Sequence, residues 1–207
     1  MTARFVTLEG GEGVGKSTQL TALAAALRAR GLDIVETREP GGSPGAEAIR
    51  ALLLEGAVDR WTAEAEALLF AAARADHVAR TIRPALATGK WVLCDRFVDS
   101  SIVYQGLVGA VGEPAIRALH EVGSHGFLPD RILLLRINDG EAAGRAGRRD
   151  AGAGDRFGAR GADYHARINA AFAALAARDP DRYRTIDAAG TAAAVTARLL
   201  AAVEDLL

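Results

Sequence analysis

The sequence predicts an α/β fold in which a mostly parallel sheet is covered by helices on both faces. Five short apolar runs alternate with longer helix-compatible stretches along the 207 residues. Strands separated by helices need crossover connections, and such connections join parallel neighbours. Half of the residues are hydrophobic and a quarter are charged, so we expect one domain, residues 1–207, that buries its own core.

The expected strands are apolar runs that end at glycine, proline or a charged residue. β-branched and aromatic side chains dominate several of them, which favours extended backbone. The run at 183–186 is the weakest of the set. In chain order, the expected strands cover residues 5–8, 32–37, 91–94, 132–135 and 183–186.

The expected helices carry apolar side chains at helical spacing. In the first helix Leu20, Leu23 and Leu27 share one face, and Gly31 ends it. Further helices are expected at 46–54, at 62–87 as the longest, on either side of 109–114, and from 191 onward. Residues 147–162 break the pattern, because they are rich in glycine and arginine and poor in large apolar groups. We expect an exposed, mobile basic loop there.

Composition excludes several classes of protein. The 25 basic and 26 acidic residues give a net charge of −1, so no nucleic-acid partner or acidic membrane surface is expected. No signal peptide and no run of about 18 uncharged apolar residues is seen, which predicts a cytoplasmic protein without a membrane partner. The single Cys94 excludes an internal disulfide and fits a small core residue in a strand. Only two of the basic residues are lysines, Lys16 and Lys90.

Residues 10–17 match G-x-x-x-x-G-K-[ST], the phosphate-binding loop of P-loop NTPases, between an expected strand and an expected helix. Glycines let consecutive N–H groups curl around a phosphate, and the helix N-terminus favours an anion. Lys16 would reach the β- and γ-phosphates, and the Ser17 hydroxyl would bind Mg²⁺. Asp95, at a strand end, could bind the same Mg²⁺, although it could instead cap the next helix or pair with Arg96. The predicted ATP-binding residues are Gly10, Gly11, Glu12, Gly13, Val14, Gly15, Lys16, Ser17 and Thr18, and the predicted metal-binding residues are Ser17 and Asp95.

A GTPase is excluded by the scarcity of lysine. The guanine-reading N-K-x-D motif needs a lysine, and outside the phosphate loop only Lys90 is present, followed by Trp91 and Val92. The chain also lacks the length for the partner domains of large motor or transport ATPases. A small-molecule phosphotransferase remains.

Further motifs resemble those of thymidylate kinases. They are Thr-Arg-Glu-Pro-Gly-Gly at 37–42, Phe-Ala-Ala-Ala-Arg at 70–74, Asp-Arg-Phe at 95–97 with Ser100, Ser101 and Tyr-Gln-Gly at 104–106, Asp-Arg-Phe at 155–157, and Thr-Ile-Asp at 185–187. The resemblance runs from residue 8 to residue 187. It implies the reaction ATP + dTMP ⇌ ADP + dTDP with Mg²⁺, on the route to dTTP. It also implies a five-stranded parallel P-loop NTPase sheet, a small mobile lid at about 140–162, and a homodimer.

The resemblance also assigns the acceptor site, and the residue chemistry fits. Phe70 and Arg74 lie four apart on one helix face, so one could stack on a base and the other donate to a base carbonyl; a core aromatic is the alternative for Phe70. Arginines near the strand ends can grip phosphate in a bidentate way, and surface ion pairs are their alternative. The predicted dTMP-binding residues are Glu12, Arg38, Pro40, Arg50, Phe70, Arg74, Arg96, Ser100, Ser101, Tyr104 and Gln105. Ser100 or Ser101 could instead cap a helix, and Glu12 could be an exposed loop acid.

Lid arginines complete the predicted catalytic set. The bacterial type of the family lacks an arginine in its phosphate loop and takes arginines from the lid, and residues 12–14 here carry none. A dTMP phosphate oxygen is already an anionic nucleophile, so no general base is assigned. The chain departs from the family pattern at Arg136 and Gly158. The predicted catalytic residues are Lys16, Arg96, Arg148, Arg149 and Arg156.

Two other functions stay open at this point. One is another P-loop nucleoside or nucleotide kinase with a pyrimidine acceptor. The second is a regulatory module that binds nucleotide without turnover; acceptor-site and lid arginines argue against it, because simple binding needs neither.

Overall fold

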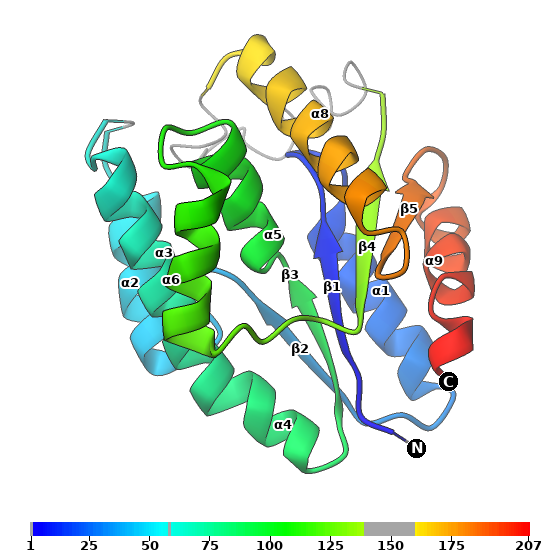
Figure 1. The fold of residues 1–207 in the computed structure, drawn as a ribbon. Coiled ribbons are helices and arrows are strands. Elements are labelled where there is room, and N and C mark those ends of the chain that lie inside the picture. Colours follow the sequence, from blue (N-terminus) through cyan, green and yellow to red (C-terminus); the bar gives the residue numbers. More distant parts are fainter. Residues whose placement is uncertain (1, 58, 139–159) are drawn as a thin grey trace.

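The computed structural model describes residues 2–57, 59–138 and 160–207, and its centre is a five-stranded sheet (Figure 1). The strands are β1 (Phe5–Glu9), β2 (Ile34–Arg38), β3 (Trp91–Asp95), β4 (Arg131–Arg136) and β5 (Tyr183–Asp187). They lie in the order β2-β3-β1-β4-β5, and every neighbouring pair is parallel. The predicted fold class is therefore confirmed, with strand bounds within about two residues of those expected.

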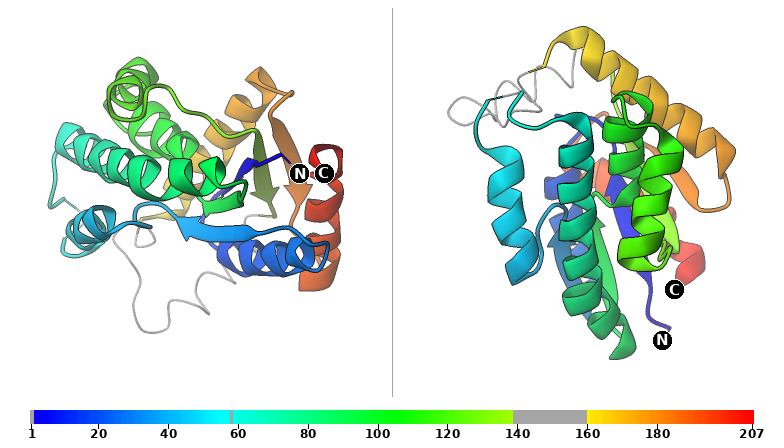
Figure 2. Two further views of the ribbon diagram at one scale, coloured as in Figure 1. Left: turned by 90° about the horizontal axis from the view of Figure 1, so that it is seen from below. Right: turned by 60° about the vertical axis from the view of Figure 1, so that its left-hand side comes forward.

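Helices connect the strands and cover both faces of the sheet (Figure 2). They are α1 (Lys16–Arg28), α2 (Pro44–Leu54), α3 (Ala63–His77), α4 (Arg83–Ala87), α5 (Val98–Ser101), α6 (Glu113–Ser124), α8 (Ala162–Arg178) and α9 (Ala192–Ala201), with shorter or wider turns η1 (Val78–Ile82), η2 (Ile102–Leu107) and η3 (Glu204–Leu206). Ser43, Thr62 and Thr191 cap α2, α3 and α9 through their side-chain oxygens.

Two helical features differ from expectation. The single helix expected at 62–87 is divided, since the π-helical turn η1 separates α3 from α4. Pro84 explains the widened turn, because proline has no N–H to donate to the fourth preceding carbonyl. The helix α8 was not identified from the sequence, although Ile168, Phe172 and Leu175 recur at helical spacing on its buried face.

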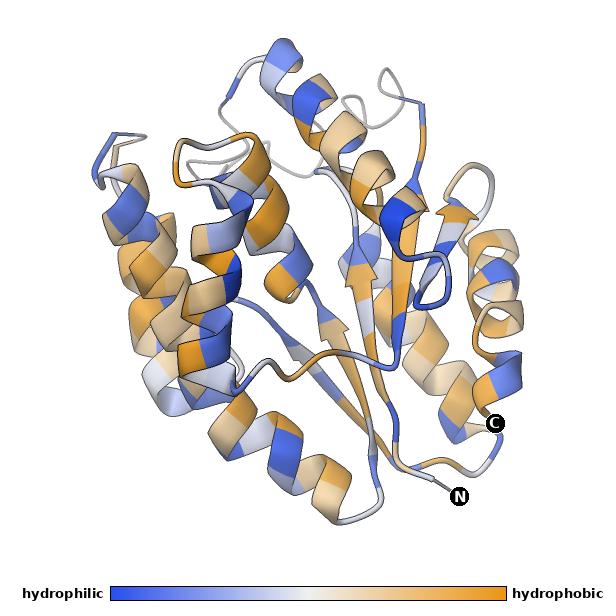
Figure 3. Ribbon diagram, viewed as in Figure 1, coloured by the Kyte–Doolittle hydropathy of each residue, from blue (hydrophilic) through white to orange (hydrophobic). Residues whose placement is uncertain are grey.

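Side chains alternate between two cores along each central strand. Val6 and Leu8 of β1 pack with α1 and α9, whereas Phe5 packs with α3, α6 and α8 on the opposite face. Figure 3 shows the matching pattern, with largely hydrophobic central strands between helices of mixed character. A parallel sheet buried on both faces accounts for the continuous apolar runs in the sequence. Cys94 is fully buried in one of these cores, as expected, and burial raises the pKa of its thiol.

The carboxyl ends of β1 and β3 lie side by side, because Leu8 pairs with Asp95 in the register of the two strands. The phosphate loop follows β1, and the 95–97 motif follows β3. Ligands of open parallel sheets bind at this edge. Within the described ranges, no helix is both long and apolar enough to cross a bilayer.

Candidate functional site

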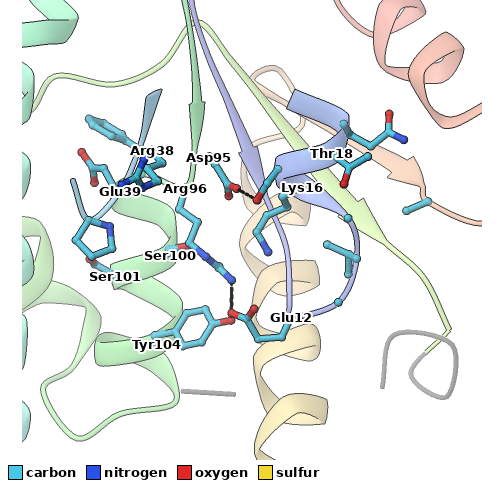
Figure 4. Close-up of a pocket in the computed structure, with 18 of the residues that line it drawn as sticks. Glu12, Lys16, Thr18, Arg38, Glu39, Asp95, Arg96, Ser100, Ser101 and Tyr104 are labelled. Carbon is cyan, nitrogen blue, oxygen red and sulfur yellow. Dashed lines mark hydrogen bonds and ion pairs between the residues drawn. The ribbon is translucent and has the colours of Figure 1, made fainter. Parts of the chain in front are cut away.

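A pocket of about 750 Å³ opens at the carboxyl edge of the sheet (Figure 4). All of the residues predicted to bind dTMP line it: Glu12, Arg38, Pro40, Arg50, Phe70, Arg74, Arg96, Ser100, Ser101, Tyr104 and Gln105. The residues from Gly13 to Thr18 and Asp95 line it as well. Gly10 and Gly11 do not line the pocket, but their carbonyl oxygens accept hydrogen bonds from Lys16, which does.

The phosphate loop is held in shape by its lysine. Nζ of Lys16 donates to the carbonyl oxygens of Gly10 at 3.1 Å and Gly11 at 2.7 Å. At Gly10 a Cβ would lie 2.5 Å from the carbonyl oxygen of Leu135, and Gly15 has φ 91° where α1 begins, so both positions require glycine. Burial, followed by repulsion from Arg96, lowers the pKa of Lys16 to about 8. A phosphate at this loop would restore the preference for the charged amine.

Ser17 and Asp95 meet across the pocket floor. The Ser17 hydroxyl donates a 2.6 Å hydrogen bond to Oδ2 of Asp95, shown as a dashed line in Figure 4. A hydroxyl and a carboxylate are the hard oxygen ligands that Mg²⁺ takes, usually together with phosphate oxygens and water. In the described part of the chain, no three His, Cys, Asp or Glu side chains cluster as a metal site. This donor set therefore fits a cation that arrives with a nucleotide.

Arg96 joins the phosphate loop to the acceptor side of the pocket. Its Nη1 donates to the Gly10 carbonyl and to Ser100 Oγ, both at 3.1 Å, and its Nη2 pairs with Glu12 at 2.5 Å. Its guanidinium carbon lies 5.2 Å from the centre of the Tyr104 ring. The backbone of Arg96 has φ 71°, which is strained for a side chain other than glycine. Surrounding contacts hold this strained residue, so its guanidinium is fixed against the loop.

Two buried carboxyl groups, those of Glu9 and Asp99, lie close to Arg96 and Ser100. Glu9 accepts from the backbone N–H of Phe97 at 2.7 Å and from the Ser100 hydroxyl at 2.6 Å. Burial and the nearby Asp99 carboxyl raise the pKa of Glu9 to about 8. Asp99 in turn accepts a 2.6 Å hydrogen bond from the Tyr183 hydroxyl. Sequence reasoning missed Glu9, whose only signal was its place at the end of an apolar strand.

One wall of the pocket is formed by α3. Phe70 and Arg74 both line the pocket, one turn apart on this helix, as their spacing predicted. Arg74 is only 3% exposed. Its Nε donates to Glu39 at 2.8 Å, and its Nη2 donates to Ser101 at 2.7 Å.

Other predicted acceptor residues contact partners within the fold. The amide of Gln105 donates to Glu66 at 2.8 Å, and Nη1 of Arg50 donates to the Pro40 carbonyl at 2.6 Å. Arg38 is half exposed and pairs with Glu47, which also receives the N–H of Gly42. Arg38 and Arg50 thus line the pocket and also contact neighbours within the fold.

Several residues of the site were not foreseen. Glu39 lines the pocket and pairs with Arg74, and His77 and Glu66 hydrogen-bond to pocket residues from outside it. Ala188, Gly190, Ala192 and Val195 line the pocket next to the phosphate loop. Spacing gave no signal for them, because their partners lie far away in the sequence. Of the sequence-predicted residues, Arg148, Arg149, Arg156 and Gly158 lie outside the described residues. Arg136 stands exposed at the end of β4.

Comparisons with known proteins agree with this geometry. The family model described as "Thymidylate kinase" matches residues 8–199. A thymidylate kinase from Rhizorhabdus wittichii is 64% identical over 207 residues, which is 100% of both chains. One from Nitrobacter winogradskyi is 49% identical over 98% of this chain and 88% of that protein. The crystal structure of thymidylate kinase from Ehrlichia chaffeensis superimposes with a TM-score of 0.78 at 28% identity, covering 99% of each chain.

Proposed function

Because this chain belongs to the thymidylate kinase family and phosphorylates dTMP to dTDP with ATP for dTTP synthesis, we propose that its pocket binds the two nucleotides end to end. The donor would lie over the phosphate loop and the acceptor against α3. Arg96 carries this proposal, since its guanidinium bridges Gly10 of the loop and Ser100 of the acceptor side. The γ-phosphoryl group would pass in line between the two halves.

The donor half binds ATP through the phosphate loop. Consecutive N–H groups of residues 10–18 and the N-terminus of α1 would surround the phosphates, with Lys16 on the β- and γ-phosphates. Ala188 and Gly190 form an adjoining small-residue wall that would admit the nucleoside. Ser17 and Asp95 would hold Mg²⁺, which would neutralise developing phosphate charge.

The acceptor half binds dTMP. The Phe70 ring would stack on the base, and Arg74 would donate to a base carbonyl. Arg38, Arg50 and Arg96 would bind the phosphate. The remaining contacts to base, sugar and phosphate would come from Glu12, Pro40, Ser100, Ser101, Tyr104 and Gln105. Since dTMP brings an anionic oxygen nucleophile, this half needs to orient the acceptor and screen charge, and no side chain serves as a general base.

The basic segment at about 140–162 would act as a lid of the single kinase domain, residues 1–207. Arg148, Arg149 and Arg156 would close over the transferring phosphoryl group and stabilise its charge. The absence of arginine at residues 12–14 supports this assignment, because the phosphate loop itself supplies no such cation.

We also propose a cytoplasmic homodimer. Leu68 of α3 is 55% exposed and Val122 of α6 is 81% exposed, and these two helices pack against each other. Exposed apolar side chains on neighbouring helices favour a protein partner. Sedimentation would give twice the 21.6 kDa chain mass, and Val122→Glu would shift the equilibrium toward monomer. A monomer in the parent protein contradicts the proposal.

The cytoplasmic location is supported by the free, buried Cys94, which fits a reducing compartment.

An ADP-release assay over an acceptor panel tests the substrate assignment. Purified protein with MgATP would be offered dTMP, dUMP, CMP, AMP, GMP or thymidine. ADP should appear with dTMP and far less with the purine nucleotides. Release with thymidine but not dTMP would identify a nucleoside kinase, and ADP independent of any acceptor would identify a simple ATPase.

A further inference from the structure

We infer that Glu39 and His77 are positioning residues that orient Arg74 and thereby select a 4-oxo pyrimidine over a 4-amino pyrimidine. The inference rests on the role of Arg74 proposed above and extends it to Glu39, which lines the pocket beside Arg74, and to His77 behind it. A fixed chain of five side chains, from Thr37 through His77, Glu39 and Arg74 to Ser101, carries the argument.

The guanidinium of Arg74 is tied on two of its three nitrogens. Nε donates to Glu39 and Nη2 donates to Ser101, and the group also lies 5.5 Å from the centre of the Phe97 ring. Among the described residues, Nη1 has no hydrogen-bond partner, and Arg74 lines the pocket. The protein therefore holds the plane of the guanidinium and leaves one donor edge for a ligand.

Both carboxylate oxygens of Glu39 have partners within the fold. Its side chain is 4% exposed; Oε2 accepts from Arg74, and Oε1 lies 3.0 Å from Nδ1 of His77. Burial alone would raise the pKa of Glu39, but Arg74 and His77 together hold it below its usual value. An ionised carboxylate can only accept hydrogen bonds, so Nδ1 of His77 is the donor.

His77 joins Glu39 to Thr37 at the other end of this series of side chains. Its side chain is 0% exposed, and Nε2 lies 2.7 Å from Oγ1 of Thr37 on β2. Gly42 packs closely against the ring, since a Cβ added at Gly42 would lie 2.4 Å from Nε2. Both oxygens of Glu39 therefore have partners, so the carboxylate that pairs with Arg74 is oriented from its other side by His77.

This arrangement has a chemical consequence for the acceptor. A guanidinium N–H only donates, so it pairs with the carbonyl at position 4 of thymine or uracil and opposes the amino group at position 4 of cytosine. A site that orients a hydrogen-bonding group rejects the mismatched ligand strongly, because its buried polar atom is left unpaired. A guanidinium free to swing would lose much of this discrimination.

The test compares dTMP with 5-methyl-dCMP, which share the 5-methyl group and differ at position 4 (oxygen or amino group) and at N3, an N–H donor in dTMP and an acceptor in 5-methyl-dCMP. Glu39→Gln keeps the side-chain shape, but its single amide oxygen cannot accept from both Arg74 and His77. His77→Leu removes both ring nitrogens. In each variant the ratio of kcat/KM for dTMP over 5-methyl-dCMP should fall by at least about tenfold. The KM for dTMP should rise, while the KM for ATP stays unchanged.

Two variants separate positioning from general damage to the fold. His77→Asn keeps an N–H where Nδ1 lies and should restore most of the ratio. His120→Gln replaces a second buried histidine nearby, one that hydrogen-bonds to the Phe127 carbonyl and makes no hydrogen bond to this chain of side chains. It should leave the ratio unchanged even if the Tm falls.

The outcomes distinguish this inference from the proposal beneath it. If Arg74→Lys lowers the ratio while Glu39→Gln and His77→Leu leave it unchanged, the positioning inference is wrong and the role of Arg74 stands. If Arg74→Lys leaves the ratio unchanged, both are wrong. Equal losses of activity with both acceptors would also overturn the inference. Circular dichroism shows which variants fold, and the conservative Glu39→Gln decides the matter where His77→Leu does not fold.

Discussion

The hydroxyl of Ser17 donates a 2.6 Å hydrogen bond to Oδ2 of Asp95, although 78 residues separate them in the chain. This contact links the first turn of α1 to the end of β3. It places two hard oxygen ligands together beside the phosphate loop, where a nucleotide would bring Mg²⁺.

Removing one of these ligands should raise the magnesium requirement. We expect Ser17→Ala to increase the Mg²⁺ concentration for half-maximal activity by about 10- to 100-fold, because the cation loses an oxygen contact. Ser17→Thr keeps the hydroxyl and serves as the matched control. Titration of activity with Mg²⁺ at saturating ATP and dTMP is the measurement, and coincident curves for the alanine and parent proteins would contradict the assignment.

The two lysines of the chain provide a second matched pair. Lys16→Ala should lower kcat by about 100- to 1,000-fold, since a preorganised cation at the transferring phosphates is lost. Lys90→Ala should leave kcat unchanged, because Lys90 makes only an exposed ion pair with Asp33 at 3.4 Å. Steady-state kinetics of both variants test this contrast. Comparable losses in the two would indicate a structural effect of lysine removal.

The predicted lid arginines should affect turnover more than binding. Alanine at Arg148, Arg149 or Arg156 should reduce kcat by at least about tenfold for the residue that meets the transferring phosphoryl. Nucleotide affinity, measured by calorimetry on the same proteins, should change much less, since the charge they stabilise develops in the transition state. Unchanged kcat in all three variants would rule out the lid assignment.

His120 should make stability depend on pH. Its Nε2 contacts the Phe127 carbonyl at 2.8 Å, and its buried Nδ1 has no hydrogen-bond partner among the described residues. Burial, followed by repulsion from Arg74, lowers its pKa from 6.5 to about 4. Between pH 6.5 and 4 the His120 side chain is therefore protonated in the unfolded chain and neutral in the folded protein. The free energy of unfolding should fall as pH drops from 6.5 toward 4, by less than about 1.4 kcal/mol per pH unit, and this loss should level off below pH 4.

A neutral substitution isolates this effect. His120→Gln keeps an N–H for the Phe127 carbonyl and does not titrate, so its free energy of unfolding should fall less steeply between pH 6.5 and 4. Urea unfolding of the parent and of His120→Gln over this range gives the comparison. His125→Gln is the control, because His125 is exposed and its replacement should leave the parent slope unchanged. Parallel slopes in parent and His120→Gln would contradict the prediction.

The sequence predicted the residues that line the pocket better than the residues that hold them in place. The match at residues 10–17 and the spacing of Phe70 and Arg74 are local features, and helix or strand geometry alone carries them into three dimensions. The division of the 62–87 helix and the presence of α8 were missed. The 62–87 helix is divided because Pro84 changes the hydrogen-bond pattern of a continuous apolar stretch. The helix α8 directly follows a glycine-rich basic segment, which gave no signal for a helix start.

The sequence by itself predicted a parallel α/β sheet, a phosphate-binding loop and, through the family resemblance, a set of acceptor-site residues between 12 and 105 that line one pocket. Only the tertiary structure decided how the buried charges are paired. Arg74 meets Glu39 across 35 residues, and Phe97 meets Glu9 across 88. Those partners depend on the strand order β2-β3-β1-β4-β5, which brings distant loops to one edge. Local spacing does not encode that order, because it follows from the packing of the whole sheet between its two helical layers.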